Sequence, residues 1–154
     1  MKIAILYSSV TGNSRTMAKL EEQFFLRAGC QVTVAEMEQT DPVILQRVDG
    51  VVIATSTYTG GVIPPEAEDF FSDLEQLDLK GQQLVYGIVG TGEKYYGVNY
   101  NLAPDHFEAA FNKIGAIQGA PSIKIELSVQ QADVPLFRDF SQSMLAKLKE
   151  VASV

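Results

Sequence analysis

The chain has 154 residues, the usual size of one domain, with 46% apolar and 20% charged residues, which excludes a disordered or fibrous protein. Its formal net charge of -7 disfavours nucleic acid and anionic membranes as partners, because binding to either needs clustered Lys and Arg. We therefore expect residues 1–154 to form a single domain whose protein partners are basic.

The sequence contains one cysteine, Cys30, and one histidine, His106, so it offers no cluster of metal ligands. The N-terminal apolar run, residues 3–6, is too short for a signal peptide, and no apolar run approaches the roughly 20 residues of a membrane-spanning helix. We expect a monomer in a reducing compartment, the cytoplasm, with no metal and no membrane contact.

Five runs of strand length follow one another at residues 2–7, 32–34, 51–55, 84–89 and 123–127. The first, third and fourth are rich in Ile and Val without polar alternation, which is typical of strands covered on both faces. The second and fifth alternate apolar and polar residues, which favours positions at the edges of a sheet.

Amphipathic segments between these runs predict helices. The apolar positions of the first are Met17, Leu20, Phe24, Phe25 and Ala28. The next helix begins at Pro65 and carries on its polar face Glu66, Asp69 and Asp73. The apolar positions of the third helix are Phe107, Ala110, Phe111 and Ile114. Asp133 should cap the last helix, whose apolar positions are Phe137, Phe140, Met144, Leu148 and Val151. Residues 41–47 are too short for an assignment.

This alternation predicts an α/β fold, a doubly wound five-stranded parallel sheet with helices on both faces. Right-handed crossovers and the two edge strands favour the order 2-1-3-4-5. In such sheets the ligand binds outside the carboxyl ends of the strands, where the strand order reverses. The loops after the first, third and fourth strands should therefore carry the site.

The loop after the first strand reads Ser9-Val10-Thr11-Gly12-Asn13-Ser14 and runs directly into a helix. Hydroxyl side chains and a glycine at such a turn direct O–H and N–H donors at a phosphate, and the helix N-terminus adds partial positive charge. The loop lacks the lysine of a P-loop and the G-x-G-x-x-G pattern of dinucleotide sites. A phosphate monoester is the ligand that it fits.

The other two loops read Ser56-Thr57-Tyr58-Thr59-Gly60-Gly61 and Gly90-Thr91-Gly92-Glu93-Lys94-Tyr95-Tyr96. Two tyrosine-bearing loops beside one crevice would hold a flat conjugated ligand by burial and stacking. No nucleophile or substrate pocket is visible, so we assign no catalytic residue.

These three loops resemble those of flavodoxins, whose first loop follows the pattern Ser/Thr-x-Thr-Gly-x-Ser/Thr. The resemblance runs from Met1 to the last helix, and residues 119–134 leave no room for the inserted loop of longer members, so the chain is similar to the short-chain type. It implies FMN as the cofactor and low-potential electron transfer between redox enzymes. The order 2-1-3-4-5 with FMN at its switch point is itself known from flavodoxins, so the position of the site applies a known rule.

The resemblance assigns the phosphate to the first loop: Ser9, Val10, Thr11, Gly12, Asn13 and Ser14. It assigns the ribityl chain or the ring to Ser56 and Thr57, the two ring faces to Tyr58 and Tyr96, and the pyrimidine edge to Glu93. The remaining cofactor-binding residues are Thr59, Gly60, Gly61, Thr91 and Gly92.

The implied partners are basic redox proteins, a reductase donor and an enzyme acceptor, that dock transiently on the carboxylates near the second loop. Alternatives remain open: a flavodoxin-like activator of ribonucleotide reductase, or a component of another flavin-dependent oxidoreductase such as a quinone reductase. A receiver-like signalling domain has the same topology, but it needs an aspartate where Ser56-Thr57-Tyr58 stands.

Overall fold

A parallel sheet lies at the centre of the structure, a computed structural model that describes residues 1–8, 12–58, 61–93 and 101–153. The strands are β1 (Lys2–Tyr7), β2 (Gln31–Glu36), β3 (Gly50–Ser56), β4 (Val85–Gly92), β5 (Ile117–Gln118) and β6 (Ile123–Glu126). The helices are α1 (Asn13–Arg27), α2 (Glu68–Glu75), α3 (Ala103–Lys113) and α4 (Val134–Ala152).

The strand order is β2-β1-β3-β4-β5, with every pair parallel, so the predicted order is confirmed. The last position differs in detail from the prediction. Two short strands share it, because β5 pairs with the start of β4 and β6 pairs with its end. Residues 119–122 separate the two, and the strand expected over residues 123–127 ends at Glu126.

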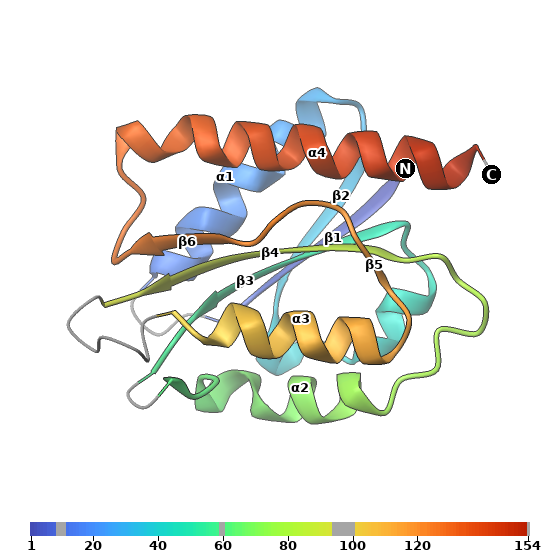
Figure 1. The fold of residues 1–154 in the computed structure, drawn as a ribbon, viewed down its shortest axis with the longest axis horizontal. Coiled ribbons are helices and arrows are strands. Elements are labelled where there is room, and N and C mark those ends of the chain that lie inside the picture. The colour runs from blue at the N-terminus through green and yellow to red at the C-terminus, as the bar shows by residue number, and fades with distance from the viewer. Residues whose placement is uncertain (9–11, 59–60, 94–100, 154) are drawn as a thin grey trace.

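Helices α1 and α4 cover one face of the sheet, and α2 and α3 cover the other (Figure 1). Successive residues of β1 point to opposite faces: Ile5 packs in the cluster that contains Phe137, and Leu6 packs in the cluster that contains Phe107. Each such side chain contributes roughly 1.5–3 kcal/mol by leaving water. Burial on both faces explains why the central strands show no polar alternation.

The structure defines the segment that the sequence left unassigned, and it corrects one cap. The crossover from β2 to β3 contains a 3-10 turn, Pro42–Gln46, and the Asp41 carboxylate accepts a hydrogen bond from the N–H of Val43 at 2.9 Å. The Asp133 carboxylate does not cap α4. It accepts a hydrogen bond from the N–H of Gln130 at 2.8 Å, because a short 3-10 turn precedes the helix.

The buried face of α1 is rotated from the one predicted. Its buried residues are Ser14, Met17, Ala18, Glu21 and Phe25, whereas Leu20 and Phe24 are half-buried and Ala28 is exposed. Glu21 is fully buried, and neither of its carboxylate oxygens has a hydrogen-bond partner among the described residues. Burial raises the pKa of this carboxyl from 4.5 to about 9.

We expect Glu21→Met to raise the free energy of unfolding of the apoprotein at neutral pH. Between pH 4.5 and about 9 the unfolded carboxylate is ionised while the folded carboxyl keeps its proton, so stability falls as pH rises through this window. At pH 7 the cost of keeping Glu21 protonated in the folded state is on the order of 3 kcal/mol, because each pH unit above the unfolded pKa of 4.5 adds about 1.4 kcal/mol. Urea unfolding from pH 5 to 8 measures it.

The gain should shrink toward pH 5, because this pH approaches the unfolded pKa of 4.5, below which both states hold the proton. Glu22→Gln on the same helix is the control, since Glu22 makes only a surface ion pair with Lys19 at 3.5 Å. A gain from Glu21→Met that is the same at pH 5 and pH 8 would contradict a buried neutral carboxyl.

Candidate functional site

The bases of the three predicted loops meet where β1, β3 and β4 end, at the left of Figure 1. The N–H of Ser8 donates to the carbonyl of Ala54 at 3.1 Å, and the Ser8 and Thr55 hydroxyl oxygens are 3.4 Å apart. The N–H of Thr57 donates to the carbonyl of Thr91 at 3.0 Å. Direct hydrogen bonds therefore join the first loop base to the second and the second to the third.

Of the first loop, the structure describes Gly12, Asn13 and Ser14, whereas Ser9, Val10 and Thr11 lie outside the described residues. Gly12 precedes α1 with a φ of 93°, a left-handed conformation that glycine adopts without a steric penalty. The carbonyl of Gly12 accepts hydrogen bonds from both the N–H and the hydroxyl of Thr16, each at 3.0 Å. These bonds fix the entry into the helix.

Ser14 lies in the first turn of α1 and is only 1% exposed, yet its hydroxyl has no hydrogen-bond partner among the described residues. The first turn of a helix also presents main-chain N–H groups and partial positive charge. No side-chain hydrogen bond from a described residue caps α1. This end of the helix therefore suits an anion, and Ser14 would give it a hydroxyl donor.

In the second loop, Thr59 and Gly60 lie outside the described residues, and hydrogen bonds join the residues on either side of them. The N–H of Gly61 donates to the carbonyl of Tyr58 at 3.0 Å, and the N–H of Tyr58 donates to the carbonyl of Val62 at 3.1 Å. These bonds fix the position of Tyr58 relative to Gly61 and Val62.

Two residues at the start of α3 contact the second loop, and the sequence did not indicate these contacts. The hydroxyl of Thr57 accepts a hydrogen bond from the N–H of Ala103 at 3.0 Å. Nε2 of His106 lies 3.1 Å from the carbonyl oxygen of Gly61 and can donate to it. Ser56 ends β3 beside them and is half-buried.

The hydroxyl of Tyr58 donates to Oε1 of Glu66 at 2.7 Å. Burial, then the hydrogen bond and the charge of Glu66, raise the pKa of Tyr58 to about 12, so the phenol stays protonated. The prediction that Glu66 shares an exposed acidic face is wrong, because this side chain is half-buried against Tyr58. Asp69 and Asp73 are exposed as expected.

In the third loop, the buried hydroxyl of Thr91 donates to the carbonyl of Leu127. The N–H of Leu127 donates in turn to the carbonyl of Gly92 at 3.0 Å, so the segment after β6 supports the end of β4. Glu93 is exposed, and Tyr96 lies outside the described residues.

Asn101 is a further site-supporting residue that the sequence analysis missed. It is fully buried in a left-handed conformation, with φ at 55°. Its Nδ2 donates to the carbonyls of Gly90 and Ile125 at 3.2 and 3.0 Å. A Cβ on Gly90 would collide with Pro104 and lie 2.7 Å from Oδ1 of Asn101, so only glycine fits there. The Asn before a proline-containing helix start was the available signal, since Asn tolerates this conformation.

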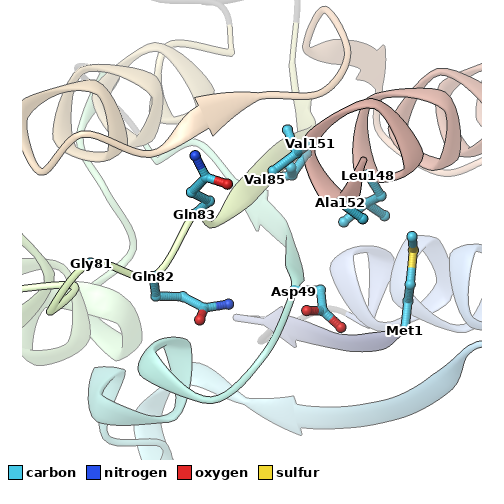
Figure 2. Close-up of a pocket in the computed structure, with 9 residues that line it drawn as sticks. All are labelled: Met1, Asp49, Gly81, Gln82, Gln83, Val85, Leu148, Val151 and Ala152. Carbon is cyan, nitrogen blue, oxygen red and sulfur yellow. The ribbon is translucent and has the colours of Figure 1, made fainter. Parts of the chain in front are cut away.

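A hollow of about 440 Å³ lies at the opposite end of the sheet, beside the amino ends of β1 and β4 (Figure 2). Two of its polar side chains already have main-chain partners: Asp49 accepts from the N–H of Lys2 at 2.8 Å, and Gln82 donates to the carbonyl of Val48 at 2.6 Å. The site at the carboxyl ends therefore remains the stronger candidate.

The described residues include no group of three His, Cys, Asp or Glu side chains placed to hold a metal ion. None of the helices described is both long and apolar enough to cross a bilayer. The arrangement has a helix start suited to an anion at one end and Tyr58 at the other. It suits an elongated ligand with a phosphate and a flat ring.

Comparison with known proteins gives a consistent result. The family model described as Flavodoxin matches residues 5–136. A probable flavodoxin 1 of Bacillus subtilis is 30% identical over 94% of this chain and 90% of its own. A solved short-chain flavodoxin associated with a bacterial microcompartment has a TM-score of 0.90 at 33% identity, covering 96% of this chain and 99% of that one. A flavodoxin from Streptococcus pneumoniae TIGR4 has a TM-score of 0.89 at 31% identity, with the same coverage.

Asn101→Ala should lower the free energy of unfolding by about 2–4 kcal/mol, through two lost hydrogen bonds and a left-handed alanine. Asn101→Gly loses the same bonds but adopts that backbone freely, so it should cost about 1 kcal/mol less. Urea unfolding of the three proteins measures both values. If the two variants lost equal free energy of unfolding, the left-handed backbone at position 101 would carry no penalty for alanine.

Proposed function

This chain belongs to the flavodoxin family and is an FMN-binding electron-transfer protein, and we propose that the described loop residues hold the cofactor with its phosphate at the start of α1. When bound, FMN supplies one- and two-electron transfer. The observation that carries the proposal is the buried Ser14 hydroxyl, which has no partner among the described residues. A phosphate oxygen would complete its hydrogen bonding.

The first loop would bind the phosphate with Gly12, Asn13 and Ser14, together with Ser9, Val10 and Thr11 before them. Arg15 is exposed, so binding there depends on hydroxyl and N–H donors and on the helix dipole. Neutral donors that are fixed before binding need little reorganisation.

The second and third loops would bind the ribityl chain and the ring. Tyr58 is half-buried and its hydroxyl is anchored, which leaves the ring in a defined orientation beside the cofactor. Ser56, Thr57, Thr91 and Gly92 lie at the adjoining strand ends. The roles of Thr59, Gly60, Gly61, Glu93 and Tyr96 rest on the resemblance.

For partners, we propose basic redox proteins that dock beside the second loop. Glu68, Asp69 and Asp73 are exposed on α2, the next α-helix after that loop. Complementary charge raises the rate of encounter without requiring a large interface, which suits transient electron transfer. The same position suits a carrier that exchanges electrons with more than one enzyme.

Two alternatives differ in what they require. A receiver-like domain needs a phosphate-accepting aspartate after β3, where Ser56 and Thr57 stand. A ribonucleotide reductase activator would use the same cofactor site within a dedicated complex, and the similarity to flavodoxins over nearly the full chain favours the general carrier.

We also propose a single domain in a reducing compartment, which fits the one buried thiol, Cys30.

Ser14→Ala should weaken FMN binding about 10- to 100-fold, the effect of one lost hydrogen bond to a charged group, about 1.5–3 kcal/mol. It should leave apoprotein stability unchanged or higher, because it removes a buried hydroxyl without a described partner. Titration of apoprotein with FMN and with riboflavin measures the effect. The loss should vanish with riboflavin, which has no phosphate.

Ser141→Ala on α4 is the matched control, since that buried hydroxyl already donates to the carbonyl of Arg138 at 2.8 Å. It should lower stability and leave FMN affinity unchanged. If Ser14→Ala bound FMN as tightly as the parent protein, the assignment of the phosphate to this helix start would be wrong.

Electron transfer to a basic reductase should slow by roughly tenfold or more from low to high ionic strength, because exposed charges are screened within about 10 Å at 0.1 M salt. Asp69→Asn with Asp73→Asn should flatten this dependence. The control is Asp139→Asn with Glu150→Gln, which neutralises two exposed carboxylates on α4. Stopped-flow measurements give the electron-transfer rate of all three proteins as a function of ionic strength. Equal slopes for the three would show that α2 is not part of the docking surface.

A further inference from the structure

Tyr58 and Glu66 form a hydrogen-bonded pair at the edge of the proposed flavin site. Tyr58 follows β3, and Glu66 belongs to the 3-10 turn Pro65–Ala67 that leads into α2. The 2.7 Å between the phenol oxygen and Oε1 is the length typical of a hydrogen bond from a hydroxyl to a carboxylate. Both side chains are half-buried, so water weakens this bond less than it would at the surface.

The charge of Glu66 has no basic partner in the part of the chain that is described. None of the ion pairs found there includes Glu66, and its second oxygen, Oε2, is buried without a hydrogen-bond partner. Glu66 also borders a narrow hollow together with Tyr7, Ser8, Glu36 and Glu38. Glu66 therefore lies near the base of the first loop and near two other acidic residues.

We propose that Glu66, acting through the hydroxyl of Tyr58, is a positioning residue that lowers the reduction potential of the bound flavin. This inference rests on the proposed function, in which the ring of Tyr58 lies against the flavin. It gives Glu66 a task different from docking, because the side chain points to Tyr58 while Asp69 and Asp73 point to solvent.

Two physical effects act in the same direction. The hydrogen bond holds the phenol in one orientation, so the same ring face meets the flavin in every molecule. A phenol that donates to a carboxylate also has a more electron-rich ring, and the carboxylate adds negative charge nearby. An electron entering the neighbouring site is then less favoured, so the potential becomes more negative.

The test compares four holoproteins: the parent, Glu66→Gln, Tyr58→Phe and the double variant. Glutamine keeps an acceptor oxygen for Tyr58 but removes the charge. We expect Glu66→Gln to raise the ratio of reduced to oxidised flavin about tenfold at a fixed potential, which is about 59 mV for a one-electron couple. Redox titration against reference dyes, followed by visible absorption, measures this.

Tyr58→Phe gives an independent test should Glu66→Gln fail to fold. It removes the hydrogen bond and keeps an aromatic ring, so it should shift the potential in the same direction. In the Tyr58→Phe background, the further change Glu66→Gln should shift the potential by less than half as much as in the parent. This non-additivity is the signature of an effect carried through Tyr58.

Glu75→Gln is the matched control, because Glu75 is also half-buried and lies at the far end of α2. It should leave the potential unchanged. The inference is overturned if Glu66→Gln leaves the potential unchanged, if Glu75→Gln shifts it equally, or if the Glu66→Gln shift is the same in both backgrounds. The last result would mean that the carboxylate acts only through space.

A separate measurement, the emission of the bound flavin, tests whether Tyr58 lies against the cofactor. If Tyr58 covers the flavin, Tyr58→Ala should increase the emission of the bound cofactor, because it removes the stacked ring. Unchanged emission would place Tyr58 away from the flavin and would overturn the inference together with that assignment. FMN binding by the parent protein, with the Ser14 result, would then still support the phosphate end of the site.

Discussion

The whole site depends on the parallel hydrogen bonding of β1 with β3 and of β3 with β4. The register places Ser56 directly opposite Thr91, so two loops leave the sheet at the same level. The chain then departs to opposite faces, since α1 covers one side and α2 the other (Figure 1). Neither of these two helices covers the end of the sheet between them (Figure 1), and this is where parallel sheets of this order bind ligands.

Several residues around the crevice are unfavourable for folding alone. Ser14 has a buried hydroxyl without a described partner, and Asn101 and Leu127 have φ values of 55° and 57°. Such features cost about 1–3 kcal/mol each and persist only where the surrounding structure compensates. Here the compensation is a sheet buried on both faces. The described residues at the bases of the loops are therefore held in place by the sheet, so binding loses less conformational entropy there.

The features that sequence could predict are local or periodic. Apolar runs without alternation identified β1, β3 and β4, and the contiguous hexapeptide at residues 9–14 predicted the phosphate loop that we propose. The missed features join distant residues: Asn101 contacts Gly90 and Ile125, and Thr57 contacts Ala103. Glu66 looked like one of several exposed carboxylates, because helical spacing gives its position relative to Asp69 but not the direction of its side chain. Glu21 shows the same limit, since a glutamate on an amphipathic helix indicates the polar face.

The acidic residues around the second loop thus fall into two groups that salt should affect differently. Glu68, Asp69 and Asp73 are exposed, so mobile ions screen them, and in the proposed docking they would act mainly on the rate of encounter with a basic partner. Glu66 is half-buried and bonded to Tyr58, where ions penetrate less and its field acts on its immediate neighbours. A change of ionic strength can therefore alter how often partners meet while changing the energy of the bound electron much less. Under these two proposals, residues that are close in sequence would separate the kinetics of electron transfer from its driving force.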